Sequence, residues 1–213
     1  MKKFSTIIVF AYGVIVLGLQ GFERMNLYHP RSEWIPVEIE FEDSMIPTPD
    51  GESINVWLMP NDTARFVFLL CHGNAGNNSY RQFQMQSLYA LGFSVVIFDY
   101  RGYGKSTGRP TENGLYMDVE TVYRWLVEQK KFASDQIIPV GTSLGGAVAV
   151  DLASRQPVRA LIVESSFTSK FGMAKIMFPF LPVAWLSYEQ FNSREKIAAL
   201  KCPVLIAHGD RDR

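Results

Sequence analysis

The sequence predicts an α/β fold, with a mostly parallel central sheet flanked by helices on both faces. Short apolar runs alternate along the chain with longer stretches of helical periodicity, which is the order of a parallel sheet whose connections are helices. Three polar segments that contain glycine each follow one of the apolar runs directly, and ligands bind at that edge of an open α/β sheet. The 213 residues are 47% hydrophobic with a formal net charge of zero, which fits one globular domain and gives no electrostatic footprint for nucleic acid.

The N-terminal segment, residues 1–24, is predicted to be a membrane anchor. Lys2 and Lys3 precede an uncharged stretch over residues 4–22, which as a helix would rise roughly 27 Å, close to the thickness of a bilayer core. A cleaved signal peptide is the second interpretation, although the residues after the stretch match a cleavage site poorly, and a buried core helix is the third. Since positive charge favours the cytoplasmic side, the domain is expected on the non-cytoplasmic side of the membrane.

Residues 25–36 are expected to be a linker, and the domain that follows, residues 37–213, is expected to open with a hairpin. Apolar and polar residues alternate from 37 to 41, which is typical of an outer strand, and this strand can continue to Ile46. A Pro-Asp-Gly turn signal then leads into the partner strand at residues 54–59.

Alternating strands and helices follow the hairpin. Five runs have the continuous apolar character of strands buried on both faces. They lie at residues 66–71, 94–98, 137–140, 160–163 and 204–207. Three segments have helical periodicity or end at a glycine. They lie at residues 78–91, 115–126 and 144–154. Pro139 normally argues against a central strand, but its run leads directly into a glycine-rich turn.

Residues 166–191 interrupt this alternation with a segment rich in aromatic residues and methionine. Such a segment is typical of a cap over an acyl-binding pocket. It also fits two short helices packed on the core. The two interpretations are compatible, and we expect a cap-like insertion here.

The two cysteines, Cys71 and Cys202, are expected to be free and packed. Each adjoins a predicted strand, and in the predicted fold those strands are not neighbours, so the thiols lie too far apart to bridge. The spacing of cysteine and histidine residues indicates no metal site. No cofactor is expected.

Three polar segments at strand ends carry the candidate chemistry. They are His72–Gly76 (HGNAG), Gly141–Gly146 (GTSLGG) and residues 208–212 (HGDRD). The G-x-S-x-G pattern around Ser143 is typical of a nucleophile elbow, a sharp turn from strand to helix that exposes one serine hydroxyl. A serine that only caps the following helix is the alternative interpretation.

With these segments, DYRGYGKSTG at 99–108 and ESSF at 164–167, the chain from about residue 37 onward resembles the α/β-hydrolase superfamily. It is most similar to the membrane-anchored serine-hydrolase branch. The resemblance implies that Ser143 attacks an ester, thioester or amide carbonyl. The backbone N–H groups of Asn74 and Leu144 are then the expected oxyanion hole, because the tetrahedral intermediate needs donors aimed at its oxygen.

The same resemblance implies Asp212 as the acid of a catalytic triad, with Asp210 and then Glu164 as alternatives. His72 and His208 are implied to be structural. The family's chain order is Ser, Asp, His, and the sequence stops one residue after Asp212. We therefore expect a chain truncated within the fold, without the last strand and helices, and with activity impaired by loss of the histidine.

Two functions from different classes remain open at this point. The first is a serine hydrolase with a small acyl or lipid-like substrate, held at a membrane by the N-terminal segment. The second is a catalytically silent, membrane-anchored module of the same fold that binds a lipid or a partner through residues 167–191. Neither implies nucleic acid as a partner.

Overall fold

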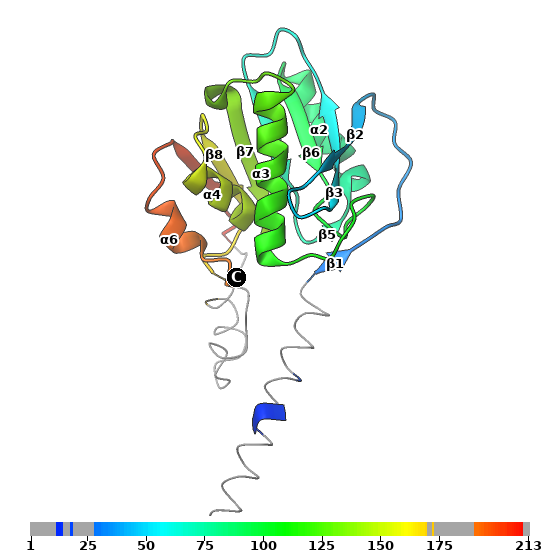
Figure 1. Ribbon diagram of the computed structural model, residues 1–213. Coiled ribbons are helices and arrows are strands. Elements are labelled where there is room, and N and C mark those ends of the chain that lie inside the picture. Colours follow the sequence, from blue (N-terminus) through cyan, green and yellow to red (C-terminus); the bar gives the residue numbers. More distant parts are fainter. Residues whose placement is uncertain (1–11, 15–17, 19–27, 170–171, 173–189, 211–213) are drawn as a thin grey trace, which may run out of the picture.

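The computed structural model describes residues 12–14, 18, 28–169, 172 and 190–210 (Figure 1). Seven strands form one sheet in the order β2-β3-β6-β4-β7-β8-β9. Strands β2 and β3 are antiparallel to each other, β3 is antiparallel to β6, and the remaining neighbours are parallel. The predicted α/β architecture, with its mostly parallel sheet and an antiparallel hairpin at one edge, is therefore confirmed. The strands are β2 (Glu42–Pro47), β3 (Ser53–Met59), β4 (Val67–Cys71), β6 (Ser94–Phe98), β7 (Ile137–Thr142), β8 (Leu161–Glu164) and β9 (Val204–Ala207).

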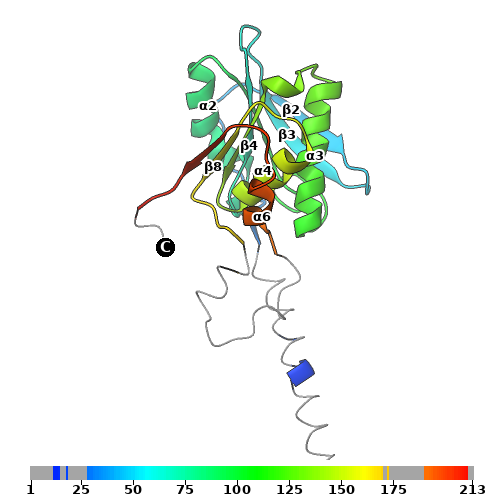
Figure 2. The same cartoon turned by 90° about the vertical axis from the view of Figure 1, so that its left-hand side faces the viewer.

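Helices cover both faces of the sheet (Figures 1 and 2). On one face, α3 (Glu112–Glu128), α4 (Leu144–Arg155) and α6 (Ser193–Ile197) lie over a core that includes Leu115 and Val148. On the other face, the 3₁₀ turn η1 (Asn78–Arg81) leads into α2 (Gln82–Ala90), whose Met85 packs into a second core with Trp57. A further 3₁₀ turn, η2 (Ser134–Gln136), precedes β7.

Pro139 is tolerated inside β7 because of the register of its neighbours. Its pairing with β4 places it opposite Leu69, whereas pairing with β8 begins only at Val140. The Ile137 carbonyl accepts a hydrogen bond from the backbone of Arg159 on the β8 side, and alternation puts the proline nitrogen on that same side. The N–H group that proline lacks would therefore lie just before the first residue of β7 that pairs with β8, so no hydrogen bond between paired residues of β7 and β8 is lost.

The first strand begins later than its sequence pattern predicts. Residues 37–41 alternate in polarity but form no ladder, and β2 starts at Glu42. The apolar residues of the stretch instead pack on the face of the sheet, where the Phe41 ring stacks on Trp57 with centroids 3.9 Å apart. The alternation of apolar and polar residues over 37–41 correctly predicted which side chains pack on the protein. It did not predict whether their backbone pairs with another strand.

The segment expected to be a linker contains a short strand. β1 (His29–Pro30) pairs in parallel with β5 (Ala75–Gly76). The Asn77 side chain donates to the carbonyls of Arg31 and Glu33, at 3.0 and 2.8 Å. We call residues 29–33 the strap, because these bonds fasten them across the loop that follows β4.

The predicted membrane location is contradicted. Among the described residues, no helix is long and apolar enough to cross a bilayer, which takes about 20 mostly apolar residues. The longest described helix, α3, has 17 residues, exposes Arg124 and packs its apolar side on the sheet. Of the predicted anchor, residues 1–24, only 12–14 and 18 are described. The expectation of a domain on the non-cytoplasmic side of a membrane is therefore wrong.

Most of the predicted cap lies outside the described residues. Residues 166–169, 172, 190 and 191 are the described part of this segment. At its end, Phe191 is 1% exposed and its ring meets those of Tyr116 and Phe167 edge-on. The cap itself stays a prediction.

Both cysteines are free, as expected. Cys71 is buried at the end of β4, and burial raises the pKa of its thiol. Cys202 precedes β9, which two strands separate from β4 in the sheet order. A thiol whose pKa is raised is a poor nucleophile at neutral pH, so Cys71 is a packing residue.

Candidate active site

Ser143 occupies a strained turn between β7 and α4. Its backbone dihedrals are φ 54° and ψ −117°, a combination that costs a non-glycine residue of order 1–3 kcal/mol. Although it stands at the N-cap position of α4, its side chain makes no capping hydrogen bond. The helix-capping interpretation is therefore not supported, and the backbone has the geometry that a nucleophile elbow requires.

The glycines around Ser143 allow the turn to pack directly on backbone. A Cβ on Gly145 would fall 2.6 Å from the His72 carbonyl oxygen, and a Cβ on Gly141 would fall 2.6 Å from the Cα of Gly146. Contacts this short do not occur for real Cβ atoms. The G-x-S-x-G spacing is thus a steric requirement for bringing β4, β7 and α4 together at one point.

The turn after β4 lies against this elbow. A Cβ on Gly73 would be 3.7 Å from the Cβ of Ser143, so the two predicted motifs are neighbours. Asn74 is half-buried and Leu144 is buried. The structure thus brings the segment of Asn74 to the elbow that carries Leu144, while their oxyanion role stays a prediction.

His72 faces away from solvent behind the turn. Its side chain is buried, and its Nδ1 lies 2.7 Å from the carbonyl oxygen of Gly73. Since a carbonyl only accepts, Nδ1 carries the proton and Nε2 does not. Burial lowers the pKa of His72 to about 4, so the ring is neutral at pH 7. These contacts suit a structural group and not a base that reaches Ser143.

The three candidate acids differ in where they lie. Asp212 is outside the described residues. Asp210 is exposed just after β9. Glu164, at the end of β8, accepts hydrogen bonds from the Thr142 hydroxyl at 3.1 Å and, through its carbonyl, from the Ser143 backbone at 2.9 Å. Glu164 thus braces the elbow from the side of β8.

No motif in the sequence marks Ser166 as part of the site, yet the Ser166 side chain contacts the elbow. Its hydroxyl donates to the Ser143 carbonyl at 2.8 Å. A serine that supports the turn from the next strand end has no local signature, because the contact joins residues 23 positions apart in the chain. Only the fold reveals it.

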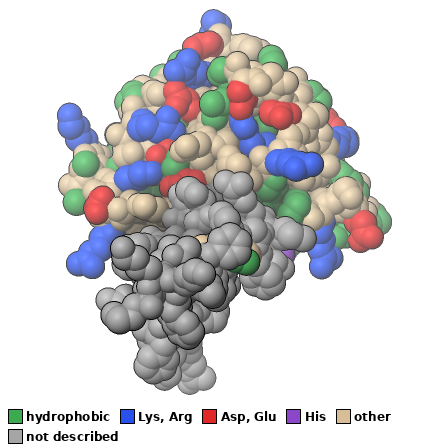
Figure 3. All heavy atoms as spheres, turned by 60° about the horizontal axis from the view of Figure 1, so that its bottom comes forward, with side chains coloured by type: hydrophobic (Ala, Val, Ile, Leu, Met, Phe, Trp, Pro, Cys, Tyr) green, Lys and Arg blue, Asp and Glu red, His purple; other side chains and the backbone are tan. Residues whose placement is uncertain are grey.

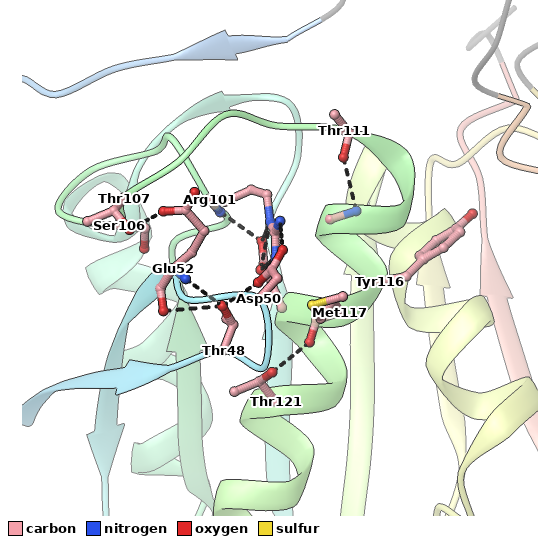
Figure 4. Close-up of polar contacts among 12 residues, drawn as sticks. Thr48, Asp50, Glu52, Arg101, Ser106, Thr107, Thr111, Tyr116, Met117 and Thr121 are labelled. Atoms are coloured by element: carbon pink, nitrogen blue, oxygen red, sulfur yellow. Dashed lines mark hydrogen bonds and ion pairs between the residues drawn. The ribbon is translucent and has the colours of Figure 1, made fainter.

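The loop after β6 is held by a buried arginine (Figure 4). The Arg101 guanidinium donates to Asp118 on α3 at 2.8 Å and to Asp50 at 2.7 Å. This contact lowers the pKa of Asp50 to about 2, whereas burial raises the pKa of Asp118 to about 6 despite the same partner. Arg101 thus ties this loop to α3 and to the turn between β2 and β3.

A family model described as the alpha/beta hydrolase fold matches residues 67–199. The chain belongs to this family. An uncharacterized protein of Mycobacterium tuberculosis, Rv2307c, is 36% identical over 208 residues, which cover 95% of this chain and 74% of the relative. Protein bem46 of Schizosaccharomyces pombe is 33% identical over 229 residues, covering 99% and 77%.

Solved structures of α/β-hydrolase proteins share the fold. The Pyrococcus furiosus esterase Pf2001 superimposes with a TM-score of 0.67 at 23% identity, over 84% of this chain and 76% of the esterase. An alpha-beta hydrolase from Vibrio vulnificus gives a TM-score of 0.66 at 23% identity, over 78% and 63%. At this identity the likeness shows the fold alone.

The described residues form no metal cluster, and the face seen in Figure 3 carries charges of both signs. Within residues 28–169 and 190–210, no group of three or more His, Cys, Asp or Glu side chains could hold a metal ion. Basic and acidic side chains are interspersed over the coloured part of the face in Figure 3. Nucleic acid binding requires basic residues gathered on one face, so this view gives it no support.

Proposed function

We propose that this α/β-hydrolase protein is a serine hydrolase of ester, thioester or amide bonds, with the Ser143 hydroxyl as nucleophile. The observation that carries the proposal is the positive φ of Ser143 at the turn from β7 to α4. Backbone strain of this kind persists where the surrounding structure enforces it. Here Glu164 and Ser166 hold the residue from the neighbouring strand end.

The orientation of one peptide supports the proposed oxyanion hole. The Gly73 carbonyl points toward the buried Nδ1 of His72. In a trans peptide the carbonyl and the following N–H point in opposite directions, so the Asn74 N–H points away from that ring. The Leu144 N–H begins α4, where the first N–H groups have no acceptor within the helix. Together they would bind the oxygen that becomes negative when Ser143 attacks.

The proposed triad is completed by Asp212 and by a base that accepts the serine proton. His72 does not suit this role, because it is buried and bonded to Gly73.

A small acyl or lipid-like molecule is the proposed substrate. The aromatic residues of 166–191 would suit an apolar acyl chain, and an esterase is among the proteins that share the fold. A catalytically silent binding module is the alternative, which the following labelling experiment separates from the hydrolase.

A fluorophosphonate probe tests the proposal directly, because it phosphonylates only an activated serine. We expect labelling of the wild-type chain, with the adduct mapped to the peptide that contains Ser143. Ser143→Ala should abolish it. Ser154→Ala is the matched control. Ser154 lies on α4, the helix that follows Ser143, and its hydroxyl donates to the Asp151 carbonyl. A folded wild-type chain that resists the probe would support the silent module.

A further inference from the structure

The loop that follows β6 presents two tyrosines to the turn that carries Asn74. Tyr100 and Tyr103 are both fully buried. The Tyr100 hydroxyl donates to the His72 carbonyl at 2.9 Å. The Tyr103 hydroxyl lies 3.0 Å from the Asn74 carbonyl oxygen and 2.8 Å from Oδ1 of the same residue. Both hydroxyl groups thus end on one turn, and the single proton of Tyr103 is shared between the carbonyl oxygen and Oδ1 of Asn74.

Three successive peptides of this turn are each held through the carbonyl oxygen. Tyr100 holds the carbonyl of His72, the His72 ring holds that of Gly73, and Tyr103 holds that of Asn74. The middle peptide carries the Asn74 N–H proposed for the oxyanion hole. The two tyrosines therefore fix the peptides on either side of the proposed donor.

We propose that Tyr100 and Tyr103 are positioning residues that hold the oxyanion turn in its reactive geometry. This inference rests on the proposed function. Neither tyrosine touches substrate in it. They act through Asn74, because a donor helps a transition state only when it is already aimed at the place where charge develops.

The loop that carries the tyrosines is itself anchored at several points, which a rigid support requires. Ser106 accepts from the Asn55 backbone at 2.8 Å and donates to the Asp99 carbonyl at 2.7 Å. Thr107 accepts from the Ser53 backbone at 2.9 Å. Figure 4 shows Ser106, Thr107 and Arg101 on the same loop, next to the N-terminal end of α3. The loop is thus tied to β3 and α3, and the tyrosines transmit that fixed position to the turn.

The hydroxyl groups can be tested separately from the rings. Tyr103→Phe and Tyr100→Phe keep the buried aromatic packing and remove only the donor. Tyr123→Phe is the matched control, because the Tyr123 hydroxyl also donates to a backbone carbonyl, that of Pro157 at 2.7 Å, away from the elbow. Each of the three variants removes a tyrosine hydroxyl that contacts a backbone carbonyl, and Tyr103→Phe also removes the contact with Oδ1 of Asn74.

Amide hydrogen exchange measures the turn itself. We expect Tyr103→Phe and Tyr100→Phe to speed exchange in peptides that span residues 72–76, and Tyr123→Phe to leave those peptides unchanged. Unchanged exchange in both tyrosine variants would overturn the positioning role, whether or not the wild-type chain reacts with any probe.

The kinetic consequence is measured on the reaction of Ser143. The second-order rate of fluorophosphonate labelling should fall about tenfold in each turn variant, and KM for a p-nitrophenyl ester should stay within twofold. An equal fall in Tyr123→Phe, or a rise in KM with kcat unchanged, would overturn the role. A wild-type chain that no probe labels would overturn the proposed function alone, since hydrogen exchange still decides the positioning role.

Discussion

Gly145 and Cys71 are in backbone contact, so close that a Cβ on Gly145 would fall 2.5 Å from the Cys71 carbonyl carbon. The first turn of α4 therefore rests on the end of β4 without any side chain between them. This contact fixes the separation of the two segments that the proposed reaction needs, the elbow and the oxyanion turn.

Gly145→Ala should destabilise the protein by about 2–3 kcal/mol or prevent folding, because its new methyl group meets backbone that cannot move aside. Gly146→Ala is the comparison, since the atoms nearest its Cβ belong to the Ser166 side chain. We expect a smaller loss there, partly recovered in Gly146→Ala with Ser166→Gly, which removes both of those side-chain atoms. Urea unfolding measures all three. Equal losses at the two glycines would contradict the backbone contact.

Ser143→Gly should be more stable than Ser143→Ala by about 1 kcal/mol, because glycine adopts a positive φ without steric cost. Neither variant should react with the probe. Lys131 also has a positive φ, 63°, in an exposed turn, so Lys131→Gly should gain stability while labelling continues. Thermal unfolding gives the comparison. A glycine variant no more stable than the alanine variant would show that the turn is unstrained.

Asp118→Ala should cost about 3 kcal/mol, because it leaves the Arg101 guanidinium buried with only Asp50 as its carboxylate partner. Both partners of the Arg101–Asp118 pair are at least nine-tenths buried. Arg124→Ala serves as the exposed comparison: this residue is 60% exposed, and its loss should cost about 0.3–0.5 kcal/mol. Comparable costs in chemical unfolding would argue that the buried pair contributes no more than a surface pair.

His72 and Asp99 should give opposite pH dependences of stability. Burial lowers the pKa of His72 to about 4 and raises that of Asp99 to about 7. The His72 contribution therefore grows as pH rises from 4 to 6.5, where the unfolded histidine loses its proton. The Asp99 contribution is complete below pH 4 and is lost as pH rises toward 7.

Single variants should separate the two contributions. Relative to the wild type at each pH, Asp99→Asn should gain stability as pH rises from 4 to 7, and His72→Gln should lose it. Urea unfolding at several pH values measures the differences. The comparison with the wild type cancels other titrating groups, such as Asp118. Parallel curves for all three proteins would contradict the burial effects on both pKa values.

The strands and the elbow could be predicted from the sequence because their causes are local. A strand buried on both faces needs a continuous apolar run, and Ile137–Thr142 shows both that run and the glycine that follows. The elbow needs small residues at fixed offsets from Ser143, and sterics at Gly141 and Gly145 explain them. These patterns hold whatever the rest of the chain does.

The supports of the site could not be predicted, because they join distant residues. The hydroxyl groups of Tyr100 and Tyr103 reach carbonyls 28 and 29 positions earlier in the chain. No periodicity signals such bonds. The pairing of β1 with β5 inside the expected linker is unpredictable for the same reason, since it depends on the folded loop. The expected membrane location, which rests on the hydropathy and charge of residues 1–24, is wrong for a different reason, since none of the described helices could cross a bilayer.

The strap links the start of the domain to the proposed oxyanion turn through hydrogen bonds. The His29 backbone N–H donates to Oδ1 of Asn74 at 3.3 Å. The Asn77 side chain donates hydrogen bonds to the carbonyls of Arg31 and Glu33. A pulling force applied at residue 28 would load Asn74 before it reached the sheet. Tension on the N-terminal side of the domain and the geometry of the turn are thereby coupled through a few hydrogen bonds.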